Sequence, residues 1–183
     1  MAVPQMLRLM PIWAAPHQRA GKAVVTPPGR NMRMTPGKST GVRVRPAQIE
    51  DAGAIAVLSG QLGYPSSPAS VRSRLRSLLL DPDHAIWVAE NSGGSVAGWI
   101  HVFVHQVLES DREAEIGGLV IDEDFRGQGA GKALVAQAER WARARRLKSI
   151  YVRSNIIRKS AHVFYQKRGY EVIKAQLAFR KPL

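Results

Sequence analysis

Apolar and polar residues alternate along the chain in a pattern that predicts an α/β (α+β) fold with a mixed central sheet. Period-two runs indicate strands, and apolar residues three or four apart indicate helices. The expected elements are, in order, a strand at 42–45, helices at 50–62 and 70–80 (the second capped by Ser70), a strand pair at 85–90 and 96–104, a polar loop at 105–113, a strand at 115–121, a helix at 129–146, a strand at 149–153, a helix at 159–168 ended by Gly169, and a strand or hairpin at 170–181.

This order reads β-α-α-β-β-β-α-β-α-β(-β). A strand, a helix and a second strand in succession favour a right-handed crossover, so the strands at 115–121 and 149–153 are expected to be parallel. The hairpin at 85–104 is expected to be antiparallel, because its turn, Asn91–Gly94, is short. The sheet is therefore expected to be mixed.

The stretch Gly118–Val135 combines the end of a strand, a glycine-rich turn and the start of a helix. After the apolar run comes an acidic turn and then Arg126-Gly-Gln-Gly-Ala-Gly131. Glycine accepts positive φ and lets backbone approach a ligand closely. A helix start offers unpaired N–H groups and the positive end of the dipole. The stretch predicts a loop that binds the phosphates of a cofactor; an ordinary turn is the alternative.

Two common phosphate-binding patterns do not fit this loop. The dinucleotide fingerprint G-x-G-x-x-G would need glycine where Lys132 stands. The P-loop would need glycine in place of Arg126 and a hydroxyl residue in place of Ala133. What remains is an R-x-x-G-x-G sequence that follows a strand.

Length and composition fit an ordinary globular protein. The 183 residues suit one domain with its own core. The chain has no cysteine, which excludes disulfides, a cysteine nucleophile and thiolate metal ligands, and suits a reducing cytoplasm. No apolar run approaches the ~18 residues of a membrane-spanning helix, so no membrane association is expected.

The net charge of +13 raises the question of a nucleic-acid partner. Residues 1–40 hold six of the 27 Lys and Arg residues and no acid, and residues 41–183 hold the other 21 together with all 14 acids. The bases of this second part are not interleaved with aromatic residues. We therefore interpret them as a solvated surface that attracts an anionic cofactor, and do not expect nucleic acid to be the partner.

Residues 1–40 differ in composition from the rest. They contain six prolines and little periodicity, so we expect a basic, proline-rich, disordered tail that precedes a folded domain at 41–183. A transit peptide is one alternative, since the segment is basic and free of acids. An over-extended start, with Met32 or Met34 as the true initiator, is another.

Two motifs and the order of elements resemble one enzyme family. The R-x-x-G-x-G loop is similar to the pyrophosphate loop of the GNAT (GCN5-related N-acetyltransferase) superfamily. Ala161–Tyr170 is similar to the family's A-x-x-F-Y-x-x-x-G-[FY] segment, and Asn155 stands near the end of the preceding strand. Residues 42–183 also match the family's topology. Asn155 precedes Tyr165 by ten positions, a longer interval than many members have.

The resemblance implies how acetyl-CoA is held. In the family the two central parallel strands splay apart, and the pantetheine amides pair with the exposed strand edge. The pyrophosphate lies on backbone N–H groups at the glycine loop, with basic side chains nearby. The donor-binding residues implied are Leu119, Val120, Ile121, Arg126, Gly127, Gln128, Gly129, Ala130, Gly131, Lys132 and Asn155.

It also implies the catalytic groups. A backbone N–H on the splayed strand, that of Val120, would polarise the thioester carbonyl. Tyr165 would protonate the leaving thiolate; a buried aromatic residue is the alternative. Glu115 is the best candidate for the base that acts on the amine, because it opens the strand that carries the acetyl group; pairing with an arginine is the alternative. Without cysteine an acetyl-cysteine intermediate is excluded, so direct transfer in a ternary complex is expected.

His101 and His105 fall on the same face of their strand. His101 has the intrinsic pKa of a base, but an ordinary structural role in the strand is favoured. Two histidines without a third ligand do not define a metal site, and no metal is expected.

The sequence thus predicts an acyltransferase that moves acetyl from acetyl-CoA to a primary amine. Its C-terminal segment resembles aminoglycoside-type members, so a small molecule is the first choice of acceptor. A protein N-terminus or lysine is the second. A domain that binds acyl-CoA without turnover, or a basic nucleic-acid binder, is the alternative of another class. Family members often dimerise, so a homodimer is an open expectation, and the cytoplasm is the expected location.

Overall fold

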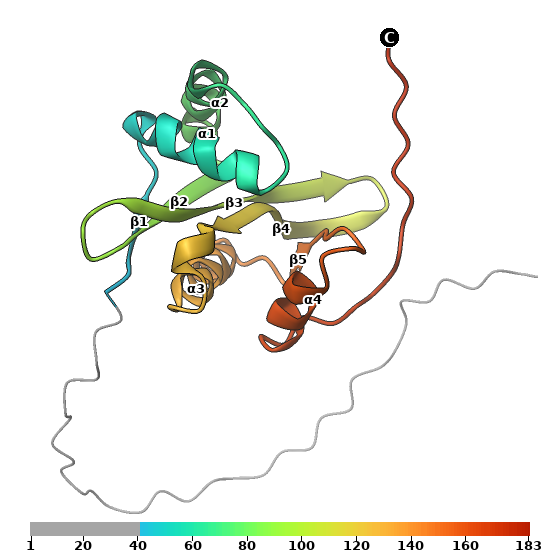
Figure 1. Cartoon of the computed structure of the whole chain (residues 1–183). Helices are drawn as coiled ribbons and strands as arrows, with labels where there is room; N and C mark the ends of the chain where they lie inside the picture. Colours follow the sequence, from blue (N-terminus) through green and yellow to red (C-terminus); the bar gives the residue numbers. More distant parts are fainter. Residues whose placement is uncertain (1–40) are drawn as a thin grey trace, which may run out of the picture. The chain divides into compact units, whose positions relative to one another are not determined.

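The computed structural model describes residues 41–183; the expectations for residues 1–40 lie outside the described part. Figure 1 shows the elements. They are β1 (Arg43–Pro46), the 3-10 turn η1 (Ile49–Asp51), α1 (Ala52–Gln61), α2 (Pro68–Leu80), β2 (His84–Glu90), β3 (Val96–Val107), β4 (Ser110–Ile121), η2 (Glu123–Phe125), α3 (Ala130–Ala144), β5 (Ile150–Val152) and α4 (Lys159–Gln166).

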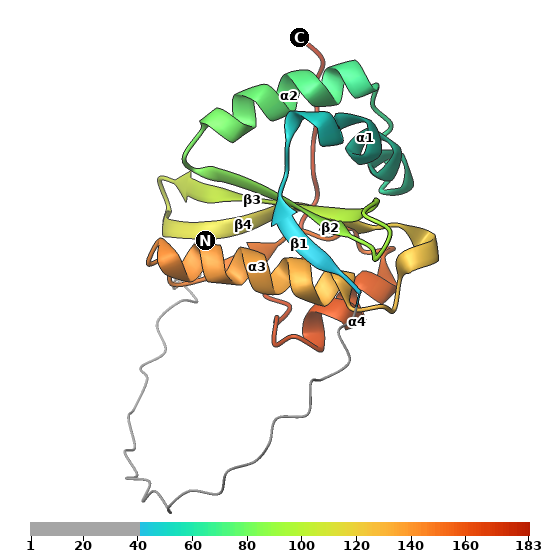
Figure 2. The same ribbon diagram turned by 90° about the vertical axis from the view of Figure 1, so that its left-hand side faces the viewer.

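The strands form one mixed sheet in the order β1-β2-β3-β4-β5. The first four pair antiparallel, and β4 and β5 pair in parallel. Helices α1 and α2 cover one face, and α3 and α4 cover the other (Figure 2). This is the mixed α+β sheet that the order of strands and helices predicted.

Two hydrophobic cores lie on the two faces, because successive strand residues point to opposite sides. In β2, Trp87 and Ala89 join the core under α3 and α4, whereas Ile86 and Val88 join the core under α1 and α2. Leu134 of α3 is fully buried in the first core. Burial of such a side chain contributes ~2 kcal/mol.

Two local boundaries differ from expectation. Helix α2 begins at Pro68, and its cap is Ser67, whose hydroxyl accepts the N–H of Ser70; Ser70 itself lies inside the helix. The polar loop expected at 105–113 is wrong, because β3 and β4 continue through it as a hairpin in which Val107 pairs with Ser110. These residues are polar, which suggested a loop, but the pairing of β3 with β4 gives their backbone N–H and C=O groups hydrogen-bond partners.

The strand expected at 170–181 is also wrong. Residues 170–183 form no regular element and extend away from α4 (Figure 1). Their apolar side chains are exposed, with Ile173 at 73%, Leu177 at 83% and Phe179 at 90%. The alternation is that of a strand, but a strand also needs a partner edge.

Within residues 41–183 no helix is long and apolar enough to cross a membrane; the cytoplasmic location stays a prediction.

Candidate active site

The site is built around the point where β4 and β5 separate. The two strands pair only from Ala114 to Ile116 on β4, against Ile150–Val152 on β5. Beyond Ile116, β4 continues to Ile121 with β3 on one side and no described strand on the other. This part of β4 therefore presents a free edge of backbone N–H and C=O groups.

Strand alternation decides which residues face that edge. The N–H of Asp122 is donated to the carbonyl of Ala97, so Asp122 faces β3. Alternate residues of a strand face the same neighbour. Val120 therefore also faces β3, opposite Trp99 in the register, and Leu119 and Ile121 face the free edge. This orientation does not support the expected role of the Val120 N–H as carbonyl polariser, and it leaves Leu119 as the nearest free donor.

The glycine loop has the backbone that an anion site needs. Gly127 and Gly129 have φ of 79° and 90°, a left-handed region that is costly for other residues. Gly129 is the N-cap of α3, and its carbonyl accepts the N–H of Ala133 as the first bond of the helical ladder. The N–H groups of Ala130, Gly131 and Lys132 precede that bond and have no partner in the ladder. Lys132 is exposed beside them.

Two of the expected donor-binding side chains are engaged locally. Arg126 donates from Nε to the carbonyl of Ile121 and pairs with Glu123, at 3.3 Å and 3.2 Å. Asn155 accepts the N–H of Ile157 in the turn before α4. Both side chains remain exposed, and these contacts do not use Nη1 of Arg126 or Nδ2 of Asn155, so each keeps a donor for a ligand.

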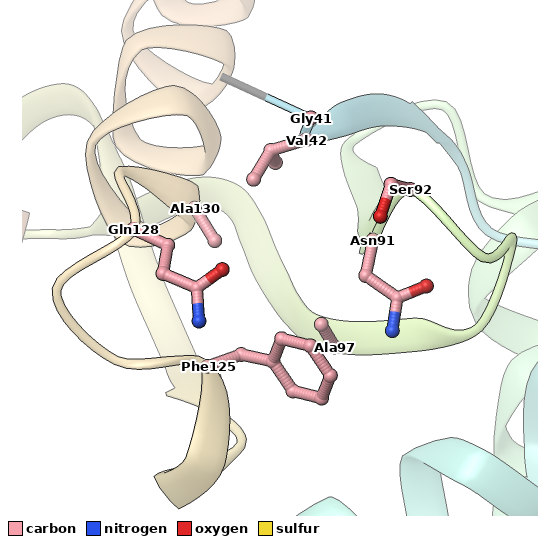
Figure 3. Close-up of a pocket in the computed structure, with 8 residues that line it drawn as sticks. All are labelled: Gly41, Val42, Asn91, Ser92, Ala97, Phe125, Gln128 and Ala130. Atoms are coloured by element: carbon pink, nitrogen blue, oxygen red, sulfur yellow. The ribbon is translucent and has the colours of Figure 1, made fainter.

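A cavity of about 290 Å³ lies on the other side of the glycine loop (Figure 3). Its walls come from the segment that enters β1, the β2–β3 turn, the start of β3 and the loop itself: Gly41, Val42, Asn91, Ser92, Ala97, Phe125, Gln128 and Ala130. Gln128 and Ala130 were expected to bind donor. They face this cavity, on the β2–β3 side, whereas the free edge of β4 lies on the β5 side.

Tyr165 is fixed by close packing between α3 and α4. The ring of Phe164 lies so near Gly131 that a Cβ there would stand 3.1 Å from it. Tyr165 follows on α4, with its ring 5.1 Å from that of Phe164, and is only 9% exposed. Burial raises the pKa of Tyr165 to about 12, against a smaller opposing effect of Arg168. The phenol therefore stays protonated at neutral pH, as a proton donor must.

Glu115 is buried and already paired. Arg153 Nη2 lies 2.6 Å from its Oε1, and His105 Nδ1 lies 3.0 Å from its Oε2. The arginine pairing considered as the alternative is thus present. Both carboxylate oxygens therefore already have an ion-pair partner, whereas a base needs a lone pair directed at the amine. Glu115 as the general base stays a prediction, with less support than the sequence alone gave it.

The glycines that precede Leu119 were not among the sequence-predicted site residues. Gly117 and Gly118 both oppose His101, which makes a bulge in β4. A Cβ on Gly118 would stand 2.7 Å from the Trp99 ring, and one on Gly117 would stand 3.0 Å from Phe103. The sequence could have predicted this bulge, because adjacent glycines inside a strand indicate a bulge or a close approach of another group.

His84 and His101 form a stacked pair on the α1/α2 face of the sheet. Nδ1 of His84 and Nε2 of His101 are 2.8 Å apart, and the ring centroids are 5.1 Å apart. Burial, and secondarily the charge of His84, lowers the pKa of His101 to about 4. His101 and His105 lie on one face of β3, as expected, but His101 contacts His84 whereas His105 contacts Glu115. Within residues 41–183 no three His, Cys, Asp or Glu side chains gather as a metal site would require.

Comparison with known proteins identifies the family. A family model described as acetyltransferase (GNAT) family matches residues 54–170, which is more than half of the chain. The chain therefore belongs to the GNAT family of acetyltransferases, as its two motifs indicated, and it is an acyltransferase. Members of this family use acetyl-CoA as donor.

Individual relatives agree with that assignment. The chain is 26% identical, over 144 residues, to an aminoglycoside N(6′)-acetyltransferase type 1 of Stenotrophomonas maltophilia; the match covers 76% of this chain and 93% of the relative. An aminoglycoside 6′-N-acetyltransferase of Acinetobacter baumannii has the same fold, with a TM-score of 0.69 and 16% identity over 78% of this chain and 99% of that one. AAC(6′)-Iy, solved with the bisubstrate analogue CoA-S-monomethyl-acetylneamine, also has the same fold. Its TM-score is 0.69, with 17% identity over 78% of this chain and 99% of that one.

Proposed function

We propose that this protein transfers the acetyl group of acetyl-CoA directly to a primary amine of a small molecule. One observation carries the proposal: the free edge of β4 at Leu119 and Ile121 leads from the strand bulge to the glycine loop and the unpaired N–H groups at the start of α3. An extended arm with amides at one end and a pyrophosphate at the other fits this combination of strand edge and helix start.

The catalytic parts are assigned as follows. The Leu119 N–H points to the free edge just beyond the bulge and polarises the thioester carbonyl. Tyr165, protonated at neutral pH, supplies a proton to the sulfur that leaves. The amine nitrogen attacks the carbonyl carbon, a C–N bond forms, and the C–S bond breaks with its electron pair going to sulfur. The amine loses one proton in the same process.

A small-molecule acceptor is the preferred class. The support comes from relatives whose names specify aminoglycosides, which are polyamines of small size. The acceptor approaches from the α1/α2 face, where Trp99, Phe103 and Glu115 lie next to the bulge. Aromatic and acidic groups suit a cationic amine before it loses its proton.

The first test is calorimetric titration with acetyl-CoA, followed by thiol release over a panel of aminoglycosides, polyamines, amino acids and peptides. The proposal expects acetyl-CoA binding and turnover with at least one small amine. Turnover only with peptides would transfer the assignment to protein acetylation. Failure to bind acetyl-CoA at all would overturn the proposed donor.

The second test concerns direct transfer. We expect that protein incubated with acetyl-CoA and then freed of it by gel filtration has unchanged mass. A retained acetyl group that a later amine removes would show a covalent intermediate and contradict the ternary complex.

We also propose a homodimer in which the C-terminal segment of each copy pairs with a strand edge of the other. Ile173, Ala175 and Leu177 alternate with Lys174 and Gln176 in that segment, and these apolar residues lie exposed. The outer edge of β5 has no described strand beside it, and such edges pair readily with another chain. Analytical ultracentrifugation of the full chain and of a chain ending at Tyr170 distinguishes a dimer that needs the segment from one that does not, and from a monomer.

A further inference from the structure

We propose that His101 is the base that takes the proton from the acceptor amine, and that His84 and Asp81 are positioning residues that keep His101 in the tautomer this requires. The inference rests on the proposed function. It assigns the acceptor side of the reaction to a group of side chains on β2 and β3, in place of the paired carboxylate of Glu115.

The three side chains form a row from the surface inward. Asp81, at the end of α2, has Oδ2 3.7 Å from Nε2 of His84. Nδ1 of His84 lies 2.8 Å from Nε2 of His101. A Cβ on Gly117 would stand 3.3 Å from Nδ1 of His101, so this last nitrogen borders the space above the bulge. Gly117 is exposed, so solvent reaches the bulge at this position.

The row determines where the protons are. A carboxylate next to Nε2 of His84 favours a proton on that nitrogen, which leaves Nδ1 of His84 as an acceptor. Nε2–H of His101 then donates to Nδ1 of His84, because one of the two facing nitrogens must carry the hydrogen. Nδ1 of His101 is left with a free lone pair that faces the space above Gly117.

That lone pair lies at the point where transfer takes place. β4 and β5 stop pairing after Ile116, and the first free N–H donor of β4 is that of Leu119. A thioester carbonyl polarised by Leu119 therefore has the Gly117 bulge beside it, and an amine that arrives from the α1/α2 face meets Phe103 and His101 there. The other atoms nearest to that position belong to the Phe103 ring.

The proton balance follows from this row. The neutral amine nitrogen forms the new C–N bond and loses its proton to Nδ1 of His101. Nε2 of His101 can pass its own proton to His84, and Nε2 of His84 can pass one to the half-exposed Asp81 and then to water. The departing thiolate takes its proton from Tyr165, which solvent restores. The products are the amide and free CoA.

Burial, and secondarily the charge of His84, favours an unprotonated His101. His84 lies on β2 with Asp81 behind it, and Glu115 lies beyond Phe103 with Arg153 and His105 attached. Burial and His84 keep the pKa of His101 near 4, so its lone pair is free throughout the neutral range. A base of this pKa is about as strong as a carboxylate. After the amine has attacked the carbonyl, its nitrogen is acidic enough to lose a proton to such a base.

The first experiment reads the tautomers directly, without any acceptor. Long-range ¹⁵N–¹H correlation spectra of the protein alone, assigned with His84→Gln and His101→Gln, should show His101 neutral and protonated at Nε2 at pH 7. A proton on Nδ1 of His101 would overturn the inference whatever the activity, because the lone pair would then face His84.

The second experiment measures rates. For the panel amine with the highest kcat/KM, His101→Gln should lower kcat about 100-fold to 1,000-fold while acetyl-CoA affinity is unchanged. Hydroxylamine is uncharged at neutral pH and depends less on a base. With hydroxylamine as acceptor, the fall in kcat caused by His101→Gln should therefore be clearly smaller. Equal losses with both acceptors would indicate a structural role and overturn the inference, and so would an unchanged kcat.

A matched pair of aspartates completes the test and covers the case in which His101→Gln does not fold. Asp81→Asn should lower kcat about tenfold, because it weakens the tautomer preference of His84. Asp83→Asn should leave kcat unchanged, since Asp83 contacts only Arg112 and Arg145 in the described ion pairs. Equal rates for the two variants would contradict the role of Asp81. Failure of the wild type to bind acetyl-CoA would refute the proposed function instead, and the tautomer result would stand apart from it.

Discussion

The two faces of the sheet bring different kinds of chemical group to the gap between β4 and β5. On the side of the glycine loop and α3, the groups are backbone amides at Leu119, Ile121 and the helix start, together with one buried phenol. On the α1/α2 side they are ionisable side chains, in the His84–His101 pair and the Glu115–Arg153 pair.

This contrast has a physical cause. Every acetyl-CoA molecule presents the same amides and phosphates, and backbone geometry is sufficient to recognise them. An acceptor amine differs from enzyme to enzyme in shape and charge, so side chains must recognise it and also remove its proton. The donor side should therefore respond to backbone strain, and the acceptor side to loss of charge or of a lone pair.

The largest effect is expected from Gly129→Val. A β-branched residue cannot readily adopt φ of 90°, so the loop should rearrange and acetyl-CoA affinity should fall more than about 100-fold. Gly94→Val is the matched control, because Gly94 has φ of 79° in the β2–β3 turn with open space around it. Calorimetry on both variants checks this; similar affinity losses in the two would mean that global strain, not the loop, is responsible.

The next effect is on turnover. Tyr165→Phe should lower kcat about 100-fold while acetyl-CoA binding stays the same, because only the proton donor is lost. Tyr170→Phe is its control: the ring lies 5.3 Å from that of Tyr165, but its hydroxyl faces Glu139. Steady-state thiol release measures both. An unchanged rate in Tyr165→Phe would remove this residue from the mechanism.

Charge loss on the acceptor side should appear as instability. Arg153→Met leaves the Glu115 carboxylate, 3% exposed, without its guanidinium, and should cost ~3 kcal/mol of unfolding free energy. Arg143→Met removes an exposed partner of Glu139 and should cost less than ~0.5 kcal/mol. Urea unfolding compares them. Equal costs would mean that Glu115 finds water or another partner when Arg153 is removed.

The most gradual effect is the pH dependence of stability that His101 confers. Its folded pKa of about 4 lies below the ordinary value of 6.5, so the unfolded chain binds the proton more readily between these values. The contribution is complete above pH ~6.5, decreases as the pH falls, and is lost near pH 4; its upper limit is ~3 kcal/mol. His101→Gln should flatten this slope in urea unfolding between pH 7.5 and 4.5. An unchanged slope would place the titration elsewhere.

Several elements of this protein depend on local sequence alone and not on contacts between distant residues. The glycines at 127 and 129, the helix after them and the segment Ala161–Tyr170 are short-range patterns, and each folds as its own spacing dictates. The mixed sheet followed from the order of strands and helices, since crossover handedness leaves few choices. The conformation of the glycine loop, the α/β class and the family were therefore accessible from the residues alone.

Contacts between distant residues decided the rest. Which edge Leu119 and Val120 face depends on pairing with β3, and Glu115 meets Arg153 across 38 positions. His84 contacts His101, 17 positions away, because of the register between β2 and β3. A shift of this register by one residue would move one of the two side chains to the opposite face of the sheet. The C-terminal segment has the alternation of a strand and lies unpaired, because a strand exists only where an edge is offered to it. Periodicity predicts which residues share a face, but the partner on that face is set by the tertiary fold.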